Sequence, residues 1–150
     1  SLKKYYQKPF NNHGILEYAD INRNGRELIE KFDIRSQGER EAVGALSGGN
    51  QQKVIVAREI AGEPELLIAA NPTRGVDVGA IEYIHEKIND ERNDGRAVLL
   101  VSFELDEILK LSDRVVVMHA GEIVGEIDPK NTSAEELGLM MAGKKTAGAE

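Results

Sequence analysis

The first part of the chain carries apolar residues at helical spacing. Residues 19–32 are predicted to form a helix, although Gly25 weakens the pattern. Its apolar side chains return to one face: Ile21, Leu28, Ile29 and Phe32. A polar connection follows, and a second helix is predicted over 48–61, where Gly62 gives a normal C-terminal signal.

After this helix, short apolar runs alternate with stretches of helical spacing. The apolar runs predict strands over 66–70, 97–102, 114–118 and 122–127. The helical stretches lie near 78–93, 104–111 and 133–141. Strands that alternate with helices imply an α/β fold with a mostly parallel sheet covered by helices, and Gly121 places a hairpin between the last two strands.

Two of these helices have recognisable N-terminal signals. Asp77 stands where a side chain can cap the helix near 78–93. Ser133 and Glu136 have the spacing of a capping box before the last helix.

Composition removes several classes of function. The chain has 150 residues, 41% of them hydrophobic, which is enough for one modest core. A net charge of −7 without a basic stripe argues against a nucleic-acid partner. Cysteine is absent, and His13, His85 and His119 lack ligand-like spacing, so no metal site is predicted. No apolar run is long enough to span a membrane.

The most informative run is Leu46-Ser47-Gly48-Gly49-Asn50-Gln51-Gln52-Lys53, at the start of the second helix. Its glycines let backbone N–H groups approach an anion closely, and the helix behind them presents unpaired N–H groups and the positive end of its dipole. The run resembles the signature motif of ATP-binding-cassette (ABC) ATPases, in the variant found in importers of simple sugars and nucleosides. A Ser-capped helix after a Gly-rich turn is the alternative without a function.

A second motif runs from Glu65 to Asp77. The corresponding strand of ABC ATPases, Walker B, ends in Asp-Glu-Pro, where the Asp organises Mg²⁺ and the Glu acts on the attacking water. Pro72 and Thr73 keep that frame, which puts Ala70 at the Asp position and Asn71 at the Glu position. A methyl group supports no metal, and an amide cannot take a proton from water.

A third position points the same way. The switch histidine of the family, which contacts the γ-phosphate, usually follows the residue matched by Ser102, but here the residue is Phe103. Three polar catalytic groups are thus absent at matched positions. The resemblance therefore implies a degenerate nucleotide site without catalytic residues of its own.

The resemblance covers only part of a cassette. No Walker A sequence (G-x-x-x-x-G-K-[ST]) occurs, and Gln7 lacks the setting of the family's Gln-bearing loop. The chain is thus expected to be the C-terminal part of a P-loop ABC-type ATPase domain. Its parts would be a helical subdomain with the signature motif (1–62), half of the RecA-like core (63–143) and a polar tail (144–150). Because importers of this class carry two cassettes in one polypeptide, the second often degenerate, we expect the end of the second cassette.

The implied function is to energise a bacterial importer of simple sugars or nucleosides. In an ABC pair each nucleotide lies between the Walker A of one cassette and the signature of the other. Ser47, Gly48, Gly49 and Asn50 would therefore bind ATP held by the opposing cassette, and Asp77 would lie at the cassette interface besides capping its helix. ATP and Mg²⁺ are expected in the full assembly, and neither in the isolated chain.

The implied partners are the first cassette of the same polypeptide, transmembrane permease subunits and, indirectly, a substrate-binding lipoprotein. The chain would then lie in the cytoplasm, held on the membrane's inner face by the permease. Two alternatives remain: a non-enzymatic cassette-like interaction module, and a soluble ABC protein without a membrane partner. The latter usually continues with Asn-His-Leu-Asp where this chain has Arg74-Gly75-Val76-Asp77.

Two groups of residues receive structural interpretations. The N-terminal residues 1–18 are predicted to be loop, with Tyr5, Tyr6 and Phe10 filling core beneath it; a docking surface for a membrane subunit is the alternative. The acidic residues at the start of the helix near 104–111 are expected to favour the helix dipole and face solvent: Glu104, Asp106 and Glu107.

Overall fold

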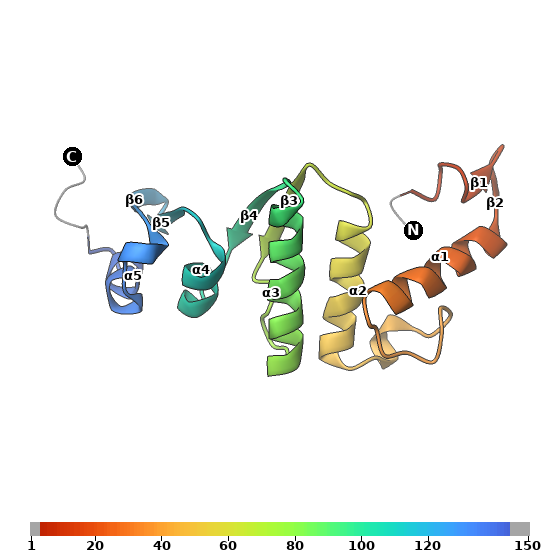
Figure 1. The fold of residues 1–150 in the computed structure, drawn as a ribbon, viewed down its shortest axis with the longest axis horizontal. Coiled ribbons are helices and arrows are strands. Elements are labelled where there is room, and N and C mark those ends of the chain that lie inside the picture. Colours follow the sequence, from red (N-terminus) through yellow and green to blue (C-terminus); the bar gives the residue numbers. More distant parts are fainter. Residues whose placement is uncertain (1–3, 145–150) are drawn as a thin grey trace.

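The computed structural model describes residues 4–144, whose elements follow one another in an elongated row (Figure 1). The N-terminal part is a short antiparallel hairpin followed by two helices. Its elements are β1 (Asn11–Asn12), β2 (Ile15–Leu16), α1 (Tyr18–Lys31), a 3-10 turn (Val43–Ala45) and α2 (Gly48–Ile60). The hairpin lies within the stretch that was predicted to be loop.

The second part alternates strands and helices. Its elements are β3 (Leu66–Ala70), α3 (Val78–Asn93), β4 (Ala97–Val101), α4 (Leu105–Leu111), β5 (Val115–His119), β6 (Glu122–Ile127), a 3-10 turn (Pro129–Asn131) and α5 (Ala134–Met141). Every strand and helix predicted from the pattern is present, with ends that differ by one residue at most. The α/β class is confirmed.

Local side-chain chemistry explains where these helices begin. The Asp77 carboxylate accepts a hydrogen bond from the Ala80 backbone N–H at 2.9 Å and so caps α3. Ser133 and Glu136 form the predicted capping box at the start of α5. Gly95, at φ +84°, follows the C-terminus of α3 in a conformation that favours glycine.

The sheet is less continuous than predicted. Among the strands of residues 4–144, β3 and β4 pair parallel, with Ala70 opposite Val101, whereas β1–β2 and β5–β6 are antiparallel. Within residues 4–144 each strand has a single hydrogen-bonded neighbour, so the strands form three separate pairs instead of one mostly parallel sheet. Apolar patterning predicts which residues form strands, but it does not predict which edges meet, and β5 finds its partner in the hairpin that immediately follows it.

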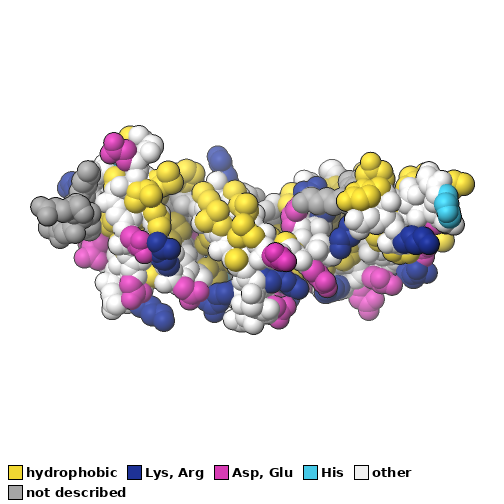
Figure 2. All heavy atoms as spheres, turned by 90° about the horizontal axis from the view of Figure 1, so that it is seen from above, with side chains coloured by type: hydrophobic (Ala, Val, Ile, Leu, Met, Phe, Trp, Pro, Cys, Tyr) yellow, Lys and Arg dark blue, Asp and Glu magenta, His cyan; other side chains and the backbone are white. Residues whose placement is uncertain are grey.

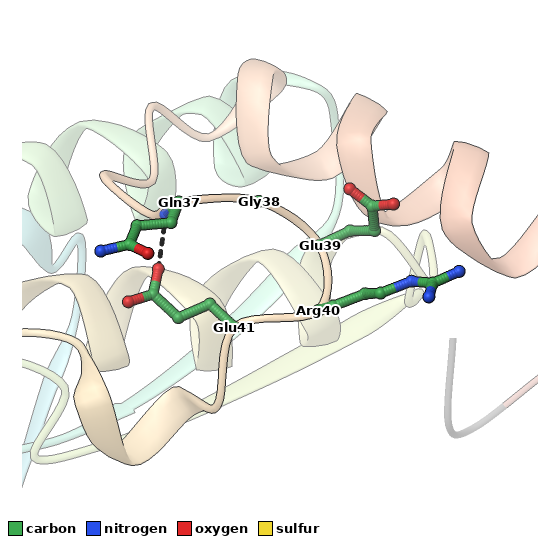
Figure 3. Close-up of a pocket in the computed structure, with 5 residues that line it drawn as sticks. All are labelled: Gln37, Gly38, Glu39, Arg40 and Glu41. Carbon is green, nitrogen blue, oxygen red and sulfur yellow. Dashed lines mark hydrogen bonds between the residues drawn. The ribbon is translucent and has the colours of Figure 1, made fainter.

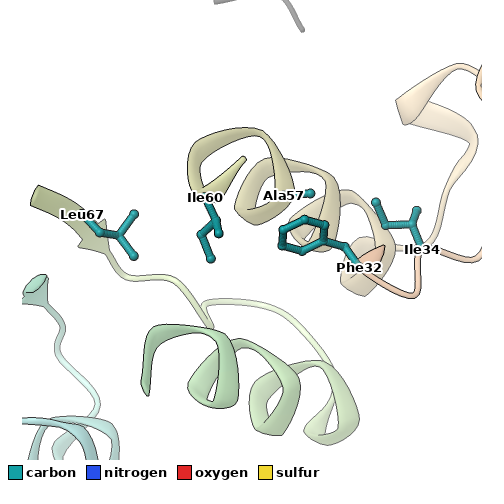
Figure 4. Close-up of a cluster of buried hydrophobic side chains, with 5 residues drawn as sticks. All are labelled: Phe32, Ile34, Ala57, Ile60 and Leu67. Carbon is teal, nitrogen blue, oxygen red and sulfur yellow. The ribbon is translucent and has the colours of Figure 1, made fainter. Parts of the chain in front are cut away.

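The hydrophobic interior is divided as well. One cluster joins α1, α2 and β3 (Figure 4): Phe32, Ile34, Ala57, Ile60 and Leu67. A second lies between α3 and α4 and is centred on Ile84, Ile88 and Leu111. The third packs α5 on β5 and β6: Val115, Val117, Val124, Leu137 and Met140. The first two clusters share the partly buried side chains of Val56, Tyr83 and Val98, so they form one joined core, and the third cluster lies apart from it.

One face of the β3–β4 pair remains uncovered. Leu67 and Val98 point toward the packed clusters, whereas four apolar side chains of the same strands are about half exposed: Leu66 (51%), Ile68 (61%), Leu99 (50%) and Val101 (48%). Seen from above, apolar side chains gather over the region of the strands (Figure 2). Parallel strands are normally covered on both faces, so this face is a candidate for association.

Other sequence interpretations need correction. Phe10 is buried as predicted, but Tyr5 and Tyr6 are more than half exposed and contact each other edge to face instead of filling core. Glu107, expected in solvent, is 3% exposed, since it turns inward to polar partners on other elements. The predicted polar tail falls mostly on residues 145–150, outside the described residues. In the part that is described, no helix is long and apolar enough to cross a membrane.

The glycine after α5 permits a test of this packing. Gly143 has φ +89°, and a Cβ built there would lie 2.8 Å from Nε2 of His119. Gly143→Ala is expected to lower the free energy of unfolding by about 2 kcal/mol or more, because backbone strain and a steric clash add. Gly95→Ala is the matched control, since Gly95 also follows a helix at positive φ but has open space around it. Chemical denaturation of both variants would measure the difference, and equal losses would contradict the packing of His119 on Gly143.

Candidate functional site

The tip of α2 is an exposed helix N-terminus. Ser47 is the N-cap residue with extended backbone (φ −61°, ψ 156°), and Gly48 opens the helix. Ser47 and Gly48 are exposed, while Gly49 is buried. No side chain in the described part of the chain caps this tip, so its first-turn N–H groups remain available, together with the positive end of the helix dipole. The tip can therefore bind an anion.

Asn50 orients the Ser47 hydroxyl. The Asn50 side-chain amide donates to Ser47 Oγ at 2.9 Å, and its carbonyl oxygen accepts from the Arg35 backbone N–H at 2.9 Å. Because Ser47 Oγ already accepts from Asn50, its own hydrogen is free to donate outward. Asn50 was predicted as a nucleotide contact; in this geometry its side chain is used within the chain and supports Ser47.

Gly49 lies in close packing, where a larger residue would force its neighbours to shift. A Cβ at this position would lie 3.0 Å from Oδ2 of Asp77 and 3.1 Å from Cβ of Ala80. The N-terminus of α2 thus packs directly against the N-terminus of α3. Asp77 both caps α3 and lies against the tip, so Ser47, Gly49 and Asp77 line one pocket.

A pocket of about 350 Å³ lies beside the tip. Lys53 in its wall donates to the backbone carbonyl and to the carboxylate of Asp33, both at 2.8 Å, and its ammonium lies 4.4 Å from the centre of the Tyr83 ring. The hydrogen bond that Lys53 donates, and then its positive charge, hold the pKa of the Asp33 carboxyl below its ordinary value. Burial, and then the nearby Asp33 charge, raises the pKa of Tyr83 to about 12, so the phenol stays neutral. These contacts fix the face of α2 that carries the tip.

Another pocket, in the loop 37–41, carries no comparable chemistry. Figure 3 shows its lining, in which the Gln37 backbone N–H donates to the Glu41 carboxylate. Glu39 pairs with Arg26 of α1 at 3.0 Å. These contacts shape the connection between α1 and α2, and they converge on no common point.

The positions matched to the Walker B strand and the switch histidine lie at the carboxyl edge of the parallel pair. Ala70 ends β3 opposite Val101, Asn71 follows at φ +46° with its N–H donating to the Val101 carbonyl at 2.7 Å, and Phe103 lies just beyond β4 with 73% exposure. Asparagine tolerates this left-handed backbone better than most residues, which gives Asn71 a local structural role.

These side chains do not suit a metal ion. A methyl group, an amide and a phenyl ring offer no carboxylate to Mg²⁺ or its waters. Across residues 4–144, no group of three or more His, Asp or Glu side chains could hold a metal. The arrangement can thus receive phosphate at the α2 tip, but it provides neither a metal ligand nor a general base at the end of β3.

The residues that support the tip were missed from the sequence. Four residues from different elements line the pocket beside the tip: Asp33, Arg35, Lys53 and Tyr83. The only local signals were spacings: Lys53 lies four residues after Gly49 on the same face of α2, and Tyr83 lies three residues after Ala80 on α3.

Curated relatives share this sequence throughout its length. The nucleoside import ATP-binding protein NupA of Lactococcus lactis is 53% identical over 143 residues, which are 95% of this chain and 28% of the relative. The guanosine import ATP-binding protein NupO of Bacillus subtilis is 50% identical, over 98% of this chain and 29% of the relative. The glucose import ATP-binding protein TsgD13 of Haloferax volcanii is 44% identical, and the match covers 100% of this chain and 28% of the relative. The chain thus spans under a third of the length of these relatives, and no family model matches it.

Solved structures agree at the level of the fold. The ADP conformation of MJ1267, an ABC transporter cassette, superposes with a TM-score of 0.62 at 23% identity, over 92% of this chain and 50% of that one. The dimeric bacterial ABC transporter cassette MJ0796 superposes with a TM-score of 0.65 at 22% identity, and the match covers 82% of this chain and 53% of that one. The chain has the fold of about half of such a cassette, and its sequence is similar to part of nucleoside and sugar import ATP-binding proteins.

Proposed function

We propose that this chain is the C-terminal part of the second cassette of an ATP-binding subunit that energises import of nucleosides or simple sugars. The observation that carries the proposal is the uncapped tip of α2, with the Ser47 hydroxyl hydrogen left free by Asn50. The names of the relatives support the import class, and two of the three are nucleoside importers.

The tip would act on ATP bound by the opposing cassette. Ser47 would donate its hydroxyl hydrogen to the γ-phosphate, and Gly48 and Gly49 would donate backbone N–H groups. Asn50 would contribute by holding Ser47, and Asp77 would lie at the interface between the two cassettes. Donors fixed in advance in this way stabilise developing phosphate charge without reorganising.

The chain's own site would retain nucleotide without cleaving it. Ala70 and Asn71 replace the groups that would support Mg²⁺ and accept a proton from water, and Phe103 cannot donate to a phosphate. Loss of a general base alone typically costs about 10²–10⁴-fold in rate. The two nucleotide sites of the pair would therefore be unequal.

The partners follow from this role. They are the first cassette of the same polypeptide, permease subunits in the membrane and, through these, a substrate-binding lipoprotein; the subunit would lie on the cytoplasmic side. A cassette pair that includes the missing Walker A half would bind ATP with Mg²⁺. In this division, residues 1–62 form the helical subdomain and residues 63–143 form half of the nucleotide-binding core.

Single-turnover kinetics would test the inequality of the sites. The complete subunit, assembled with its permease in vesicles, is expected to bind two ATP molecules and rapidly hydrolyse only one of them, because one site lacks its base and its metal support. Radiolabelled ATP, quenched in acid after filling both sites, measures the fraction cleaved. Hydrolysis of both molecules at the same rate would contradict the proposal.

A further inference from the structure

A buried polar cluster lies between the loop 71–77, α3 and α4. It consists of Thr73, His85 and Glu107, which are 7%, 8% and 3% exposed. The Thr73 hydroxyl donates to Glu107 Oε1 at 2.8 Å, and His85 Nε2 lies 3.0 Å from the same oxygen. With Glu107 as a carboxylate, which can only accept, this contact requires the His85 tautomer that carries its proton on Nε2.

The position of Glu107 in α4 explains how it can turn inward. Glu107 is the third residue of the helix, where a glutamate usually bonds back to the N-cap backbone. Here Ser102 Oγ accepts from the Glu104 N–H at 3.0 Å, so Glu107 is not needed for that bond. The helix N-terminus also favours negative charge at this position.

The cluster is not merely a satisfied core contact. Within the described residues, Glu107 Oε2 and His85 Nδ1 are buried without a hydrogen-bond partner. A buried polar atom left unpaired is costly, and an apolar trio of the same shape would avoid that cost. The arrangement therefore calls for a role beyond stability.

The loop that Glu107 holds connects the two functional regions of the chain. At one end, Asn71 is bonded to Val101 of β4 beside the degenerate positions. At the other end, Asp77 caps α3 and packs against Gly49 of the tip. Thr73 lies in the loop between Asn71 and Asp77, and its hydroxyl is hydrogen-bonded to Glu107.

We propose that Glu107 is a positioning residue: through Thr73 it holds the loop 71–77, and thereby keeps Asp77 and the α2 tip aligned for the phosphate that the tip receives. The inference rests on the proposed function of the tip. In this proposal α4, which begins just after Phe103, supports the α2 tip without contacting it.

The test uses the complete subunit and the variant Thr73→Val, which removes the hydroxyl and keeps the shape. Amides of residues 77–80 are expected to exchange hydrogen about tenfold faster, since the Asp77 cap on Ala80 loosens. The kcat for ATP is expected to fall ~10- to 100-fold with little change in KM, because a small misplacement mainly affects the transition state. Thr73→Ser should restore both values.

Two further variants separate positioning from stability. Thr132→Val removes a comparable hydroxyl bond, from Thr132 to the Asp128 carbonyl at 2.9 Å, far from the loop, and should change neither readout. Glu107→Leu should reproduce Thr73→Val, whereas Glu107→Gln keeps an acceptor for Thr73 and should stay close to wild type in exchange. Thermal melting establishes that each variant is folded.

Unchanged exchange at 77–80 in folded Thr73→Val or Glu107→Leu would overturn the inference, whatever the kcat. Suppose that Ser47→Arg abolishes turnover. Thr73→Val with faster exchange at 77–80 but the wild-type kcat would then also overturn the inference. Full turnover in Ser47→Arg would instead show that the proposed function of the tip is wrong, while the exchange data would still report on the loop.

Discussion

Under the proposed function, replacing Ser47 with arginine is expected to abolish import and ATPase activity of the complete transporter. The residue is exposed at the uncapped tip of α2, so the larger side chain can be accommodated without disturbing the interior of the subunit. Its guanidinium would occupy the space where phosphate meets the hydroxyl and the first N–H groups. Removing one such preorganised donor costs about 10²–10³-fold in rate, and blocking the whole tip removes several. ATPase and uptake assays in vesicles measure the loss.

The matched comparison is Asn71, in the site that the proposed function treats as inactive. Asn71→Ala is expected to change ATPase activity little, because an amide at this position has no catalytic function to lose. Its φ of +46° makes alanine mildly strained, so Asn71→Gly serves as a control that keeps the backbone relaxed. Similar damage from Ser47→Arg and from both Asn71 variants would refute the division of labour between the two sites.

Local chemistry made much of this fold predictable. Helix limits depend on nearby caps, and the Asp77 cap and the Ser133–Glu136 capping box lie within three residues of their partners. The Ser47-Gly48 step predicted where α2 begins for the same reason, because serine before a helix is a local N-terminal signal.

Contacts between distant residues were not predictable from one sequence. Glu107 looked like a solvent-exposed acidic residue until His85, 22 positions away, and Thr73, 34 positions away, were placed beside it. The Lys53–Asp33 pair that steadies the tip spans 20 positions. Side-chain direction at such sites depends on tertiary packing, which apolar periodicity does not describe.

The three strand pairs show the same limit. Apolar runs identified β3, β4, β5 and β6, yet an edge strand and a central strand have similar patterns when both faces are apolar. The apolar runs alone did not indicate which side chains of β3–β4 would stay exposed. The location of this exposed face on particular residues now permits a direct experiment.

The isolated chain of residues 1–150 is expected to self-associate through this face. Ile68 and Leu99 lie opposite each other on the parallel pair, and both are at least half exposed. About half of each side chain is already covered, so burying the rest between two copies gains about 1 kcal/mol per side chain, and each copy contributes two of them. Ile68→Lys combined with Leu99→Lys should therefore weaken association by ~100-fold or more. Sedimentation velocity over a concentration series measures the change.

The control must carry the same charge without touching the β3–β4 pair. Ile15→Lys with Val43→Lys replaces two apolar residues that are 71% and 45% exposed on other elements. If the association depends on the strand face, this pair of changes leaves it intact, since two positive charges alone do not remove the buried area. A wild-type chain that stays monomeric at high concentration, or equal dissociation by both pairs, would exclude the strand face as the contact. If the Ile68→Lys and Leu99→Lys pair dissociates the chain and the control pair does not, the β3–β4 face is the contact. That apolar face then drives association whenever nothing else covers it.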